Sequence, residues 1–360
     1  MKKSIKCDFG DICFLINSYK SKDYEDQLKH VNEFYIPCKV PKNEPKEISI
    51  DYVTNKEIYN KYLDECKKRE GKLYQSFENQ VHKEIECNSK KVYLINNEEY
   101  ICIKDNDLRY IILTDGRESG IKWPFRILRE LLVREREDSS FLFMHGTSLK
   151  INNRNLLLLG NSGSGKTTLA INMLSEGINQ NEFMSNDRVF INEKTMKYFP
   201  IPVVFASGTA KNNKFLDDYF KRTRLFEKRI NKIYEETGFN DKVPVPLTDI
   251  PRIFSNVELK PENDIDTILL PKIRFDMGPN FKICELNERE KWIALERTCF
   301  TPFDSESLRL EWVRKRKKNI DEITENRYDT IHDLIKNKQI LKLEYGPESE
   351  QTKIIEDIDR

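Results

Sequence analysis

The sequence contains no apolar run long enough to cross a membrane, which takes roughly 20 residues. The leucine run at residues 156–159 is far shorter. The amino-terminal stretch also lacks the continuous apolar segment of a secretory signal, because Asp8 and Asp11 interrupt it. We therefore expect a cytoplasmic protein with no membrane partner.

The eight cysteines lack the spacing of a metal site. No two of them are separated by two residues, and none stands beside a histidine, so the zinc-ligand patterns are missing. Their density is also below that of a disulfide scaffold. We expect reduced, packed cysteines without a catalytic role.

The chain has no marked excess of positive or of negative side chains. The chain has 61 Lys and Arg against 60 Asp and Glu, for a formal net charge of +1. This balance does not call for nucleic acid or an anionic surface as a partner. A local basic run at residues 314–318 could bind RNA, DNA or an acidic peptide. Acidic residues flank it, so we interpret it as a solvated helix face and expect no nucleic-acid partner.

The 360 residues predict two domains and a tail. Residues 1–120 form a strand-rich α+β domain, residues 121–346 an α/β domain, and residues 347–360 a polar, frayed tail. The amphipathic helix at 123–137 is expected to connect the two domains. Strands are predicted at 12–15, 34–40, 91–95, 100–104, 110–114, 141–144, 147–151, 156–159, 189–191, 267–270 and 340–345, and helices at 57–69, 123–137, 166–175, 213–237, 287–299, 305–316 and 321–336.

The clearest functional signal is the segment from Gly160 to Thr167, which matches G-x-x-x-x-G-K-[ST]. An apolar strand precedes it and a helical run follows. Glycines allow the loop to curl so that its backbone N–H groups converge on phosphate. Lys166 would reach the β and γ phosphates, and Thr167 would ligate Mg²⁺. The expected nucleotide-binding residues are Gly160, Asn161, Ser162, Gly163, Ser164, Gly165, Lys166, Thr167 and Thr168.

Two further residues are candidates for the chemistry. Asp187 follows the loop by about twenty residues and precedes an apolar strand, so we expect it to bind the metal with Thr167. The alternative is an ordinary turn aspartate. His145 stands one hairpin before the loop and is a candidate to contact the phosphates or the acceptor. The alternative for His145 is a satisfied core histidine.

The order of these pieces resembles the HPr kinase/phosphorylase superfamily, whose core is related to phosphoenolpyruvate carboxykinase. The order is His145-Gly146, a hairpin, the glycine loop, then Asp187 before a strand. The resemblance extends over residues 127–191 and is strongest to the HPr-kinase-like enzymes found beside peptide-maturation genes. It implies an α/β P-loop kinase core of that type, with ATP, Mg²⁺ and phosphoryl transfer to a hydroxyl.

The chain departs from the family at two places. Asn186 replaces the first acid of an Asp-Asp pair, and an amide cannot act as a base. No arginine-rich loop is found, and Lys242 to Pro246 stand near its place, so we do not expect HPr as the substrate.

The resulting hypothesis is a Mg-ATP kinase acting on a peptide, protein or small-molecule hydroxyl. Asp187 or His145 serves as the base, with Lys166 stabilising the transferred group. Lys272 and Arg274 either steady the γ-phosphate or are solvated charges. The alternatives are a nucleotide hydrolase or switch, and a nucleotide sensor without turnover. The oligomeric state stays open.

Overall fold

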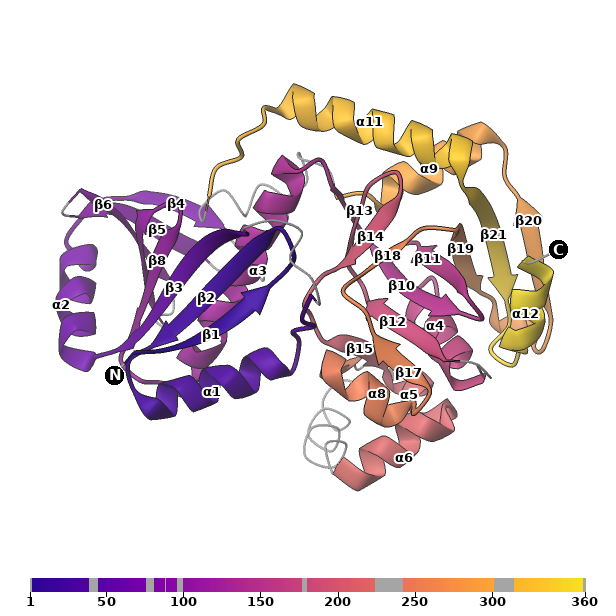
Figure 1. The fold of residues 1–360 in the computed structure, drawn as a ribbon, viewed down its shortest axis with the longest axis horizontal. Coiled ribbons are helices and arrows are strands. Elements are labelled where there is room, and N and C mark those ends of the chain that lie inside the picture. The colour runs from indigo at the N-terminus through magenta and orange to yellow at the C-terminus, as the bar shows by residue number, and fades with distance from the viewer. Residues whose placement is uncertain are drawn as a thin grey trace. The chain divides into compact units, whose positions relative to one another are not determined.

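The computed structural model shows a mixed α/β protein with several sheets and helices (Figure 1). It describes residues 2–38, 45–75, 81–87, 89–95, 100–176, 180–223, 242–300 and 314–358. The chain divides into two compact units. The first comprises Met1–Ser140 and Thr301–Ile323, and the second comprises Phe141–Phe300 and Thr324–Arg360. Within the described residues, no helix has the length and apolarity needed to traverse a lipid bilayer.

The first unit is built on an eight-stranded mixed sheet with the strand order β1-β2-β3-β8-β7-β6-β5-β4. The pairs β2–β3 and β3–β8 are parallel, and the other neighbouring pairs are antiparallel. Its elements are β1 (Lys3–Asp8), β2 (Ile12–Ser18), α1 (Ser21–Asn32), β3 (Lys46–Thr54), α2 (Lys56–Lys67), β4 (Lys72–Gln75), β5 (Val81–Cys87), β6 (Lys90–Ile95), β7 (Ile101–Asn106), β8 (Arg109–Thr114), the 3₁₀ turn η2 (Glu118–Lys122) and α3 (Trp123–Asp138).

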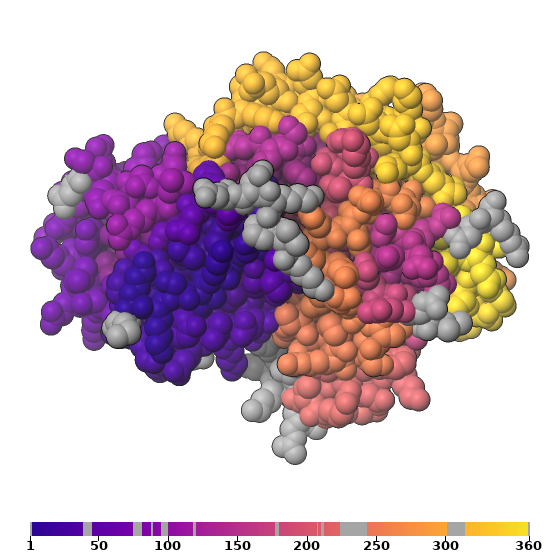
Figure 2. Space-filling model, viewed as in Figure 1, coloured from indigo at the N-terminus to yellow at the C-terminus, as the bar shows by residue number. Residues whose placement is uncertain are grey.

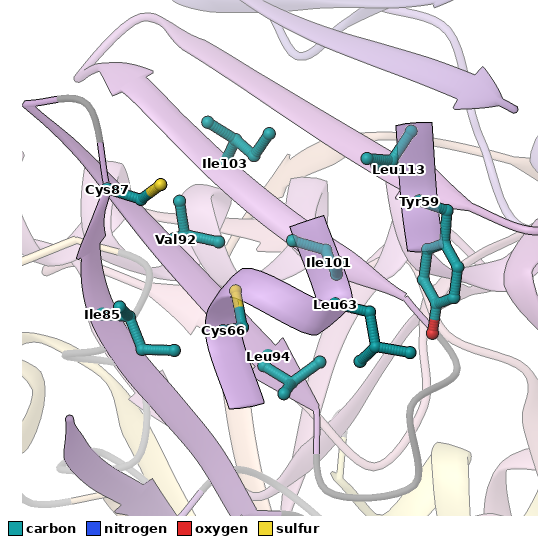
Figure 3. Packing of buried hydrophobic residues seen from close by; sticks show 10 residues of the cluster. All are labelled: Tyr59, Leu63, Cys66, Ile85, Cys87, Val92, Leu94, Ile101, Ile103 and Leu113. Carbon is teal, nitrogen blue, oxygen red and sulfur yellow. The ribbon is translucent and has the colours of Figure 1, made fainter. Parts of the chain in front are cut away.

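Strands β6, β7 and β8 of this sheet carry buried residues on both faces. Alternate residues of each strand point to opposite faces. One set packs under α2, whose Tyr59, Leu63 and Cys66 meet Ile101 and its neighbours (Figure 3). The other set faces α3, where the Trp123 ring lies 4.2 Å from that of Tyr100. This double burial explains the nearly continuous apolar runs in these strands.

The basic run at 314–318 is not a helix face. Residues 314–316 have no regular structure, and the two arginines among them pair with the acidic end of α3. Arg314, 3% exposed at its side chain, contacts Glu135 and lies 2.6 Å from Asp138. Arg316 lies 3.6 Å from Glu137. The run therefore makes internal ion pairs, although Lys315 and Lys317 are exposed.

Replacing Arg314 by alanine is expected to lower the free energy of unfolding by about 3 kcal/mol, because it takes the buried guanidinium away from the largely covered Glu135 and Asp138 carboxylates. Lys315→Ala removes an exposed charge from the same run. It is expected to change the free energy of unfolding by less than about 0.5 kcal/mol. Urea unfolding followed by circular dichroism measures both. Equal effects of the two substitutions would contradict a structural role for the Arg314 pair.

The second unit contains two larger sheets. A seven-stranded sheet has the order β17-β12-β10-β11-β19-β21-β20, and a four-stranded antiparallel sheet has the order β18-β14-β13-β9. Strands β15 and β16 pair separately. The elements are β9 (Leu142–Met144), β10 (Gly146–Ile151), β11 (Arg154–Leu159), α4 (Lys166–Glu176), β12 (Asn181–Ser185), β13 (Val189–Ile191), β14 (Thr195–Tyr198), β15 (Val203–Ala206), α5 (Ser207–Asn212), α6 (Lys214–Thr223), β16 (Lys242–Val245), η3 (Leu247–Asp249), α8 (Ile250–Ile253), β17 (Val257–Leu259), β18 (Glu262–Asp264), β19 (Thr267–Ile273), η4 (Phe275–Met277), β20 (Phe281–Glu285), α9 (Glu288–Thr298), α11 (Ile320–Asn337), β21 (Gln339–Tyr345) and α12 (Gln351–Ile358).

Strand β11 is the central strand of the larger sheet. Its four leucines, residues 156–159, are each 0% exposed, as expected for a strand covered on both faces. Strands β11, β19 and β21 are parallel, so their carboxyl ends share one edge of the sheet. The loop that follows β11 therefore lies beside the ends of β19 and β21.

Several expectations about organisation need correction. The division falls after residue 140 rather than 120, because α3 packs on the first sheet and does not connect the units. Residues 314–323 also belong to the first unit. Residues 35–38 are not a strand. The predicted helices at 213–237 and 305–316 fall partly outside the described residues, and residues 314–316 are not helical.

The carboxyl-terminal residues are not a frayed tail. Residues 351–358 form α12, with Ile354, Ile355 and Ile358 buried. The Glu176 carboxylate at the end of α4 accepts a hydrogen bond of 2.7 Å from the Gln351 N–H. Figure 2 shows these yellow residues packed against the body of the second unit. The isoleucines at helical spacing were the missed signal.

Candidate active site

The glycine loop, residues 160–165, joins the end of β11 to the first turn of α4. Gly163 and Gly165 have φ values of 81° and 94°, which favour glycine. Gly160 differs from the sequence-based expectation, because its φ is not positive. A Cβ there would lie 2.7 Å from the Ser164 Oγ, so at this position glycine provides space.

The loop is fixed to the edge of the sheet by two hydrogen bonds. The Ile273 N–H at the end of β19 donates to the Ser164 carbonyl at 3.0 Å. The Tyr345 hydroxyl at the end of β21 donates to the Gly165 carbonyl at 2.8 Å. The parallel strands therefore determine where the curled backbone lies.

These contacts predict unequal effects of adding a methyl group. A Cβ on Gly165 would lie 2.9 Å from the Ile273 Cβ and would also meet the Tyr345 hydroxyl, whereas a Cβ on Gly163 meets nothing within 4 Å. Gly165→Ala is expected to lower the free energy of unfolding by about 3 kcal/mol. Gly163→Ala carries only the backbone strain, about 1 kcal/mol. Chemical denaturation checks the difference, and equal losses would contradict it.

Lys166 lies over the loop that precedes it. Its Nζ donates to the Gly160 carbonyl at 2.6 Å and to the Asn161 carbonyl at 3.1 Å. The residue is 6% exposed, so its stem is packed and its ammonium is held at the mouth of the loop. The positive charge of Lys166 therefore lies near the first turn of α4, where the helix dipole also favours the binding of an anion.

The Thr167 hydroxyl is held by Asn186 and not by Asp187. The Asn186 Oδ1 accepts hydrogen bonds from the Thr167 Oγ1 at 2.9 Å and from the Thr147 Oγ1 at 3.0 Å. Asn186 is 3% exposed, between β12 and β13. The side chain that contacts Thr167, an expected metal ligand, is therefore the amide that stands in place of the first acid of the Asp-Asp pair.

Asp187 forms a pair with His145. The His145 Nε2 lies 2.8 Å from the Asp187 Oδ1, and their side chains are 22% and 46% exposed. Asp187 has a φ of 65°, which is uncommon for a residue other than glycine. The Arg188 N–H closes this tight turn by donating to the Asn186 carbonyl at 2.8 Å. The turn directs the carboxylate toward the His145 side of the loop.

The surroundings of Asp187 favour its ionised form. Burial is the largest single influence and would by itself raise the pKa, but the hydrogen bond and the charge of His145 oppose it. The positive charges of Arg188 and Lys166 act in the same direction, so the pKa lies below its ordinary value. A carboxylate that is ionised accepts the Nε2–H of His145, which fixes the tautomer of the ring.

His145 is not a core histidine of the kind that the first unit contains. His82 is 0% exposed, and burial lowers its pKa to about 3. The Nε2 of His82 meets the Tyr100 hydroxyl at 3.1 Å. His145 is partly exposed and paired with a carboxylate, which is the environment of a functional histidine.

Sequence reasoning missed a cation–aromatic contact beside this pair. The Arg188 guanidinium lies 5.0 Å from the centre of the Phe300 ring, and its Nε lies 3.7 Å from the Asp187 Oδ2. The Phe300 ring is also 6.2 Å from the His145 ring. The Asp-Arg dipeptide was visible in the sequence, but its partner lies far along the chain.

The other expected residues lie in different places. Asn161, Ser162 and Gly163 are exposed at the tip of the loop. The Thr168 hydroxyl meets the Thr209 hydroxyl of α5 at 2.9 Å. Arg274 pairs with Asp276, which supports the interpretation as a solvated ion pair.

A separate cavity of about 520 Å³ lies at the opposite, amino ends of β11, β19 and β21. Its polar groups bond to one another, as Arg154 does with Thr267 and Gln339.

The chain's residues fit a phosphate chain with a divalent cation. Two positive-φ glycines curl the backbone, Lys166 supplies a positive charge, and the buried Ser164 Oγ has no partner among the described residues. A Mg²⁺ ion usually takes one or two protein oxygens together with phosphate oxygens and water. Among the residues described, no group of three or more His, Cys, Asp and Glu side chains could hold a metal by itself.

Comparison with known proteins assigns the chain to no family. No family model matches the sequence, and no curated protein matches it. The architecture defines the chain as a mixed α/β protein.

Proposed function

We propose that the protein is a Mg-ATP-dependent kinase with a core of the HPr-kinase/phosphoenolpyruvate-carboxykinase type. It transfers the γ-phosphoryl group to a hydroxyl of a peptide, a protein or a small molecule. The observation that carries the proposal is that Lys166, Thr167 and the Asp187–His145 pair lie around one glycine loop at the end of β11. Anion binding, a cation ligand and a proton acceptor are the groups that such a transfer needs.

In the proposed step, the acceptor oxygen attacks the γ-phosphorus and the bond to the bridging β–γ oxygen breaks. The electron pair of that bond leaves with ADP. Lys166 neutralises charge on the phosphates, and the Thr167 hydroxyl would ligate Mg²⁺. Asp187 takes the proton of the acceptor hydroxyl, with His145 holding its other oxygen.

The low pKa of Asp187 is compatible with this role. In a loose phosphoryl-transfer transition state the attacking oxygen bears little charge, so a strong base is not required. An ionised carboxylate is available over the whole neutral range, and the hydrogen bond from His145 fixes its orientation. His145 would then act as a positioning residue.

The test is an assay with γ-labelled ATP and Mg²⁺, using water, glycerol and serine-containing peptides as acceptor probes. Label on an organic hydroxyl supports the kinase. Free phosphate alone would favour a hydrolase or switch. Tight ATP binding without either product would favour a sensor, for which the amide of Asn186 is the supporting observation. A protein that binds no ATP would contradict all three.

A further inference from the structure

Asn186 joins two hydroxyl groups that belong to different elements. Its Oδ1 accepts one hydrogen bond from Thr167 on α4 and one from Thr147 on β10. A carbonyl oxygen has two lone pairs, and both are used here. Thr147 is 0% exposed, and its backbone is fixed opposite Leu158 in the β10–β11 ladder. The amide is therefore anchored on the side of the sheet and presents its oxygen to the first turn of α4.

This arrangement determines how the Thr167 hydroxyl is oriented. A hydroxyl has one proton and two lone pairs. Because its proton is given to Asn186 at 2.9 Å, both lone pairs of the Thr167 Oγ1 are left to accept other contacts. A hydroxyl with its lone pairs free is the form that ligates a hard cation.

An amide provides this orientation without adding a charge. Asn186 is 3% exposed and directly precedes Asp187. A second carboxylate at this position would be the chain neighbour of Asp187, and repulsion between the two charges would raise the pKa of one of them. The amide keeps the hydrogen bonds to both threonines while leaving Asp187 ionised.

We propose that Asn186, anchored by Thr147, is a positioning residue that holds the Thr167 hydroxyl ready for a divalent cation. The proposal rests on the proposed function, since it assumes that a nucleotide and a cation bind at the glycine loop. It adds a role for two residues, Asn186 and Thr147, that the proposed phosphoryl transfer does not use directly.

The experiment measures how much Mg²⁺ strengthens the binding of ATP to the full-length protein. Calorimetric titrations with ATP are run in excess MgCl₂ and in EDTA, and the ratio of the two affinities is the Mg²⁺ enhancement. Asn186→Ala is expected to reduce this enhancement by about 10-fold or more, with the affinity in EDTA changed by less than about 2-fold. Asn186→Asp keeps both hydrogen bonds and is expected to retain the enhancement.

Two further variants complete the set. Thr147→Val removes only the anchoring hydroxyl and is expected to reduce the enhancement by about 3-fold. Asn192→Ala is the control, because this turn asparagine also accepts hydrogen bonds, from Lys194 and Thr195, but lies on the β13–β14 hairpin. It is expected to leave the enhancement unchanged.

The outcomes separate this inference from the proposed function. If the wild-type protein binds no ATP in either buffer, the proposed function fails and this inference fails with it. If wild type shows the enhancement and Asn186→Ala retains it, only the inference is overturned. If Asn186→Ala does not fold, Thr147→Val decides. A reduced Mg²⁺ enhancement supports the positioning role of Asn186, and an unchanged enhancement overturns it.

Discussion

Replacing Lys166 by alanine is expected to lower the affinity for ATP by about 100-fold and to reduce phosphoryl transfer below detection. The ammonium lies within 2.6 Å of the Gly160 carbonyl, over the curled backbone that would receive the phosphates. Its loss removes one positive charge from the site and leaves the charge of the phosphates to the backbone amides, the helix dipole and the cation.

Two companion variants isolate the charge. Lys166→Met keeps most of the packed stem and is expected to lose binding to the same extent, so a folding defect cannot account for the result. Lys150→Ala removes a lysine from β10 that pairs with Glu182 at 3.8 Å, away from the loop, and is expected to bind ATP normally. Isothermal calorimetry with Mg-ATP measures all three. Normal binding by Lys166→Met would contradict the phosphate role of the loop.

The local parts of the second unit could be predicted from the sequence because each carries its own signal. The leucines at 156–159 mark a strand covered on both faces, and the glycine spacing marks the turn after it. The helical pattern of residues 287–299 correctly predicted α9, and the structure adds a capping box at Asn287. Signals of this kind depend only on neighbouring residues.

The contacts that complete the site could not be predicted, because they join distant segments. The sequence presented Asn186 as a departure from a pattern, and only the fold shows Thr147 and Thr167 bonded to its amide. That Thr167 meets Asn186 while Asp187 meets His145 depends on the φ of 65° at Asp187, which the sequence does not show. This turn places adjacent residues on different partners, one on α4 and one on His145.

The domain boundary was missed for a related reason. The helix at 123–137 has an apolar side whichever unit it packs on, so periodicity alone cannot assign it. The pairing of Arg314 with the acidic end of α3 brings residues from late in the chain back to the first unit. A basic run in sequence shows its charge but not its partner, and here the partner is internal.

Asp187→Asn is expected to reduce the rate of phosphoryl transfer by about 1,000-fold while leaving the affinity for Mg-ATP within about 3-fold of wild type. The amide keeps an oxygen that can meet a cation or accept from His145, but it cannot take a proton. Single-turnover transfer with γ-labelled ATP measures the first quantity, and calorimetry the second. A large loss of the Mg²⁺ enhancement would instead assign Asp187 as a metal ligand, as the sequence first indicated.

Two control variants test whether the effect depends on the position of the aspartate and on its partner His145. Asp266→Asn makes the same change at an exposed aspartate at the amino end of β19, where its carboxylate accepts from the Asn155 N–H at 2.9 Å, and is expected to have no effect on transfer. His145→Gln retains a donor for the Asp187 Oδ1 and is expected to lower transfer by only about 10-fold. Full turnover by Asp187→Asn would show that the site is assigned to the wrong residue.

The pH dependence distinguishes a base from a purely electrostatic role. The pKa of Asp187 lies below its ordinary value, so the carboxylate is ionised throughout the neutral range and gains a proton only below the range in which an ordinary aspartate titrates. The stability that its interactions contribute is present above that range and is lost as the pH falls through the lowered pKa. The rate of transfer should therefore show no acid limb from Asp187 between pH 5 and 8. A limb in that interval that persists in Asp187→Asn would assign the proton to another group, and one that disappears with the substitution would contradict the lowered pKa.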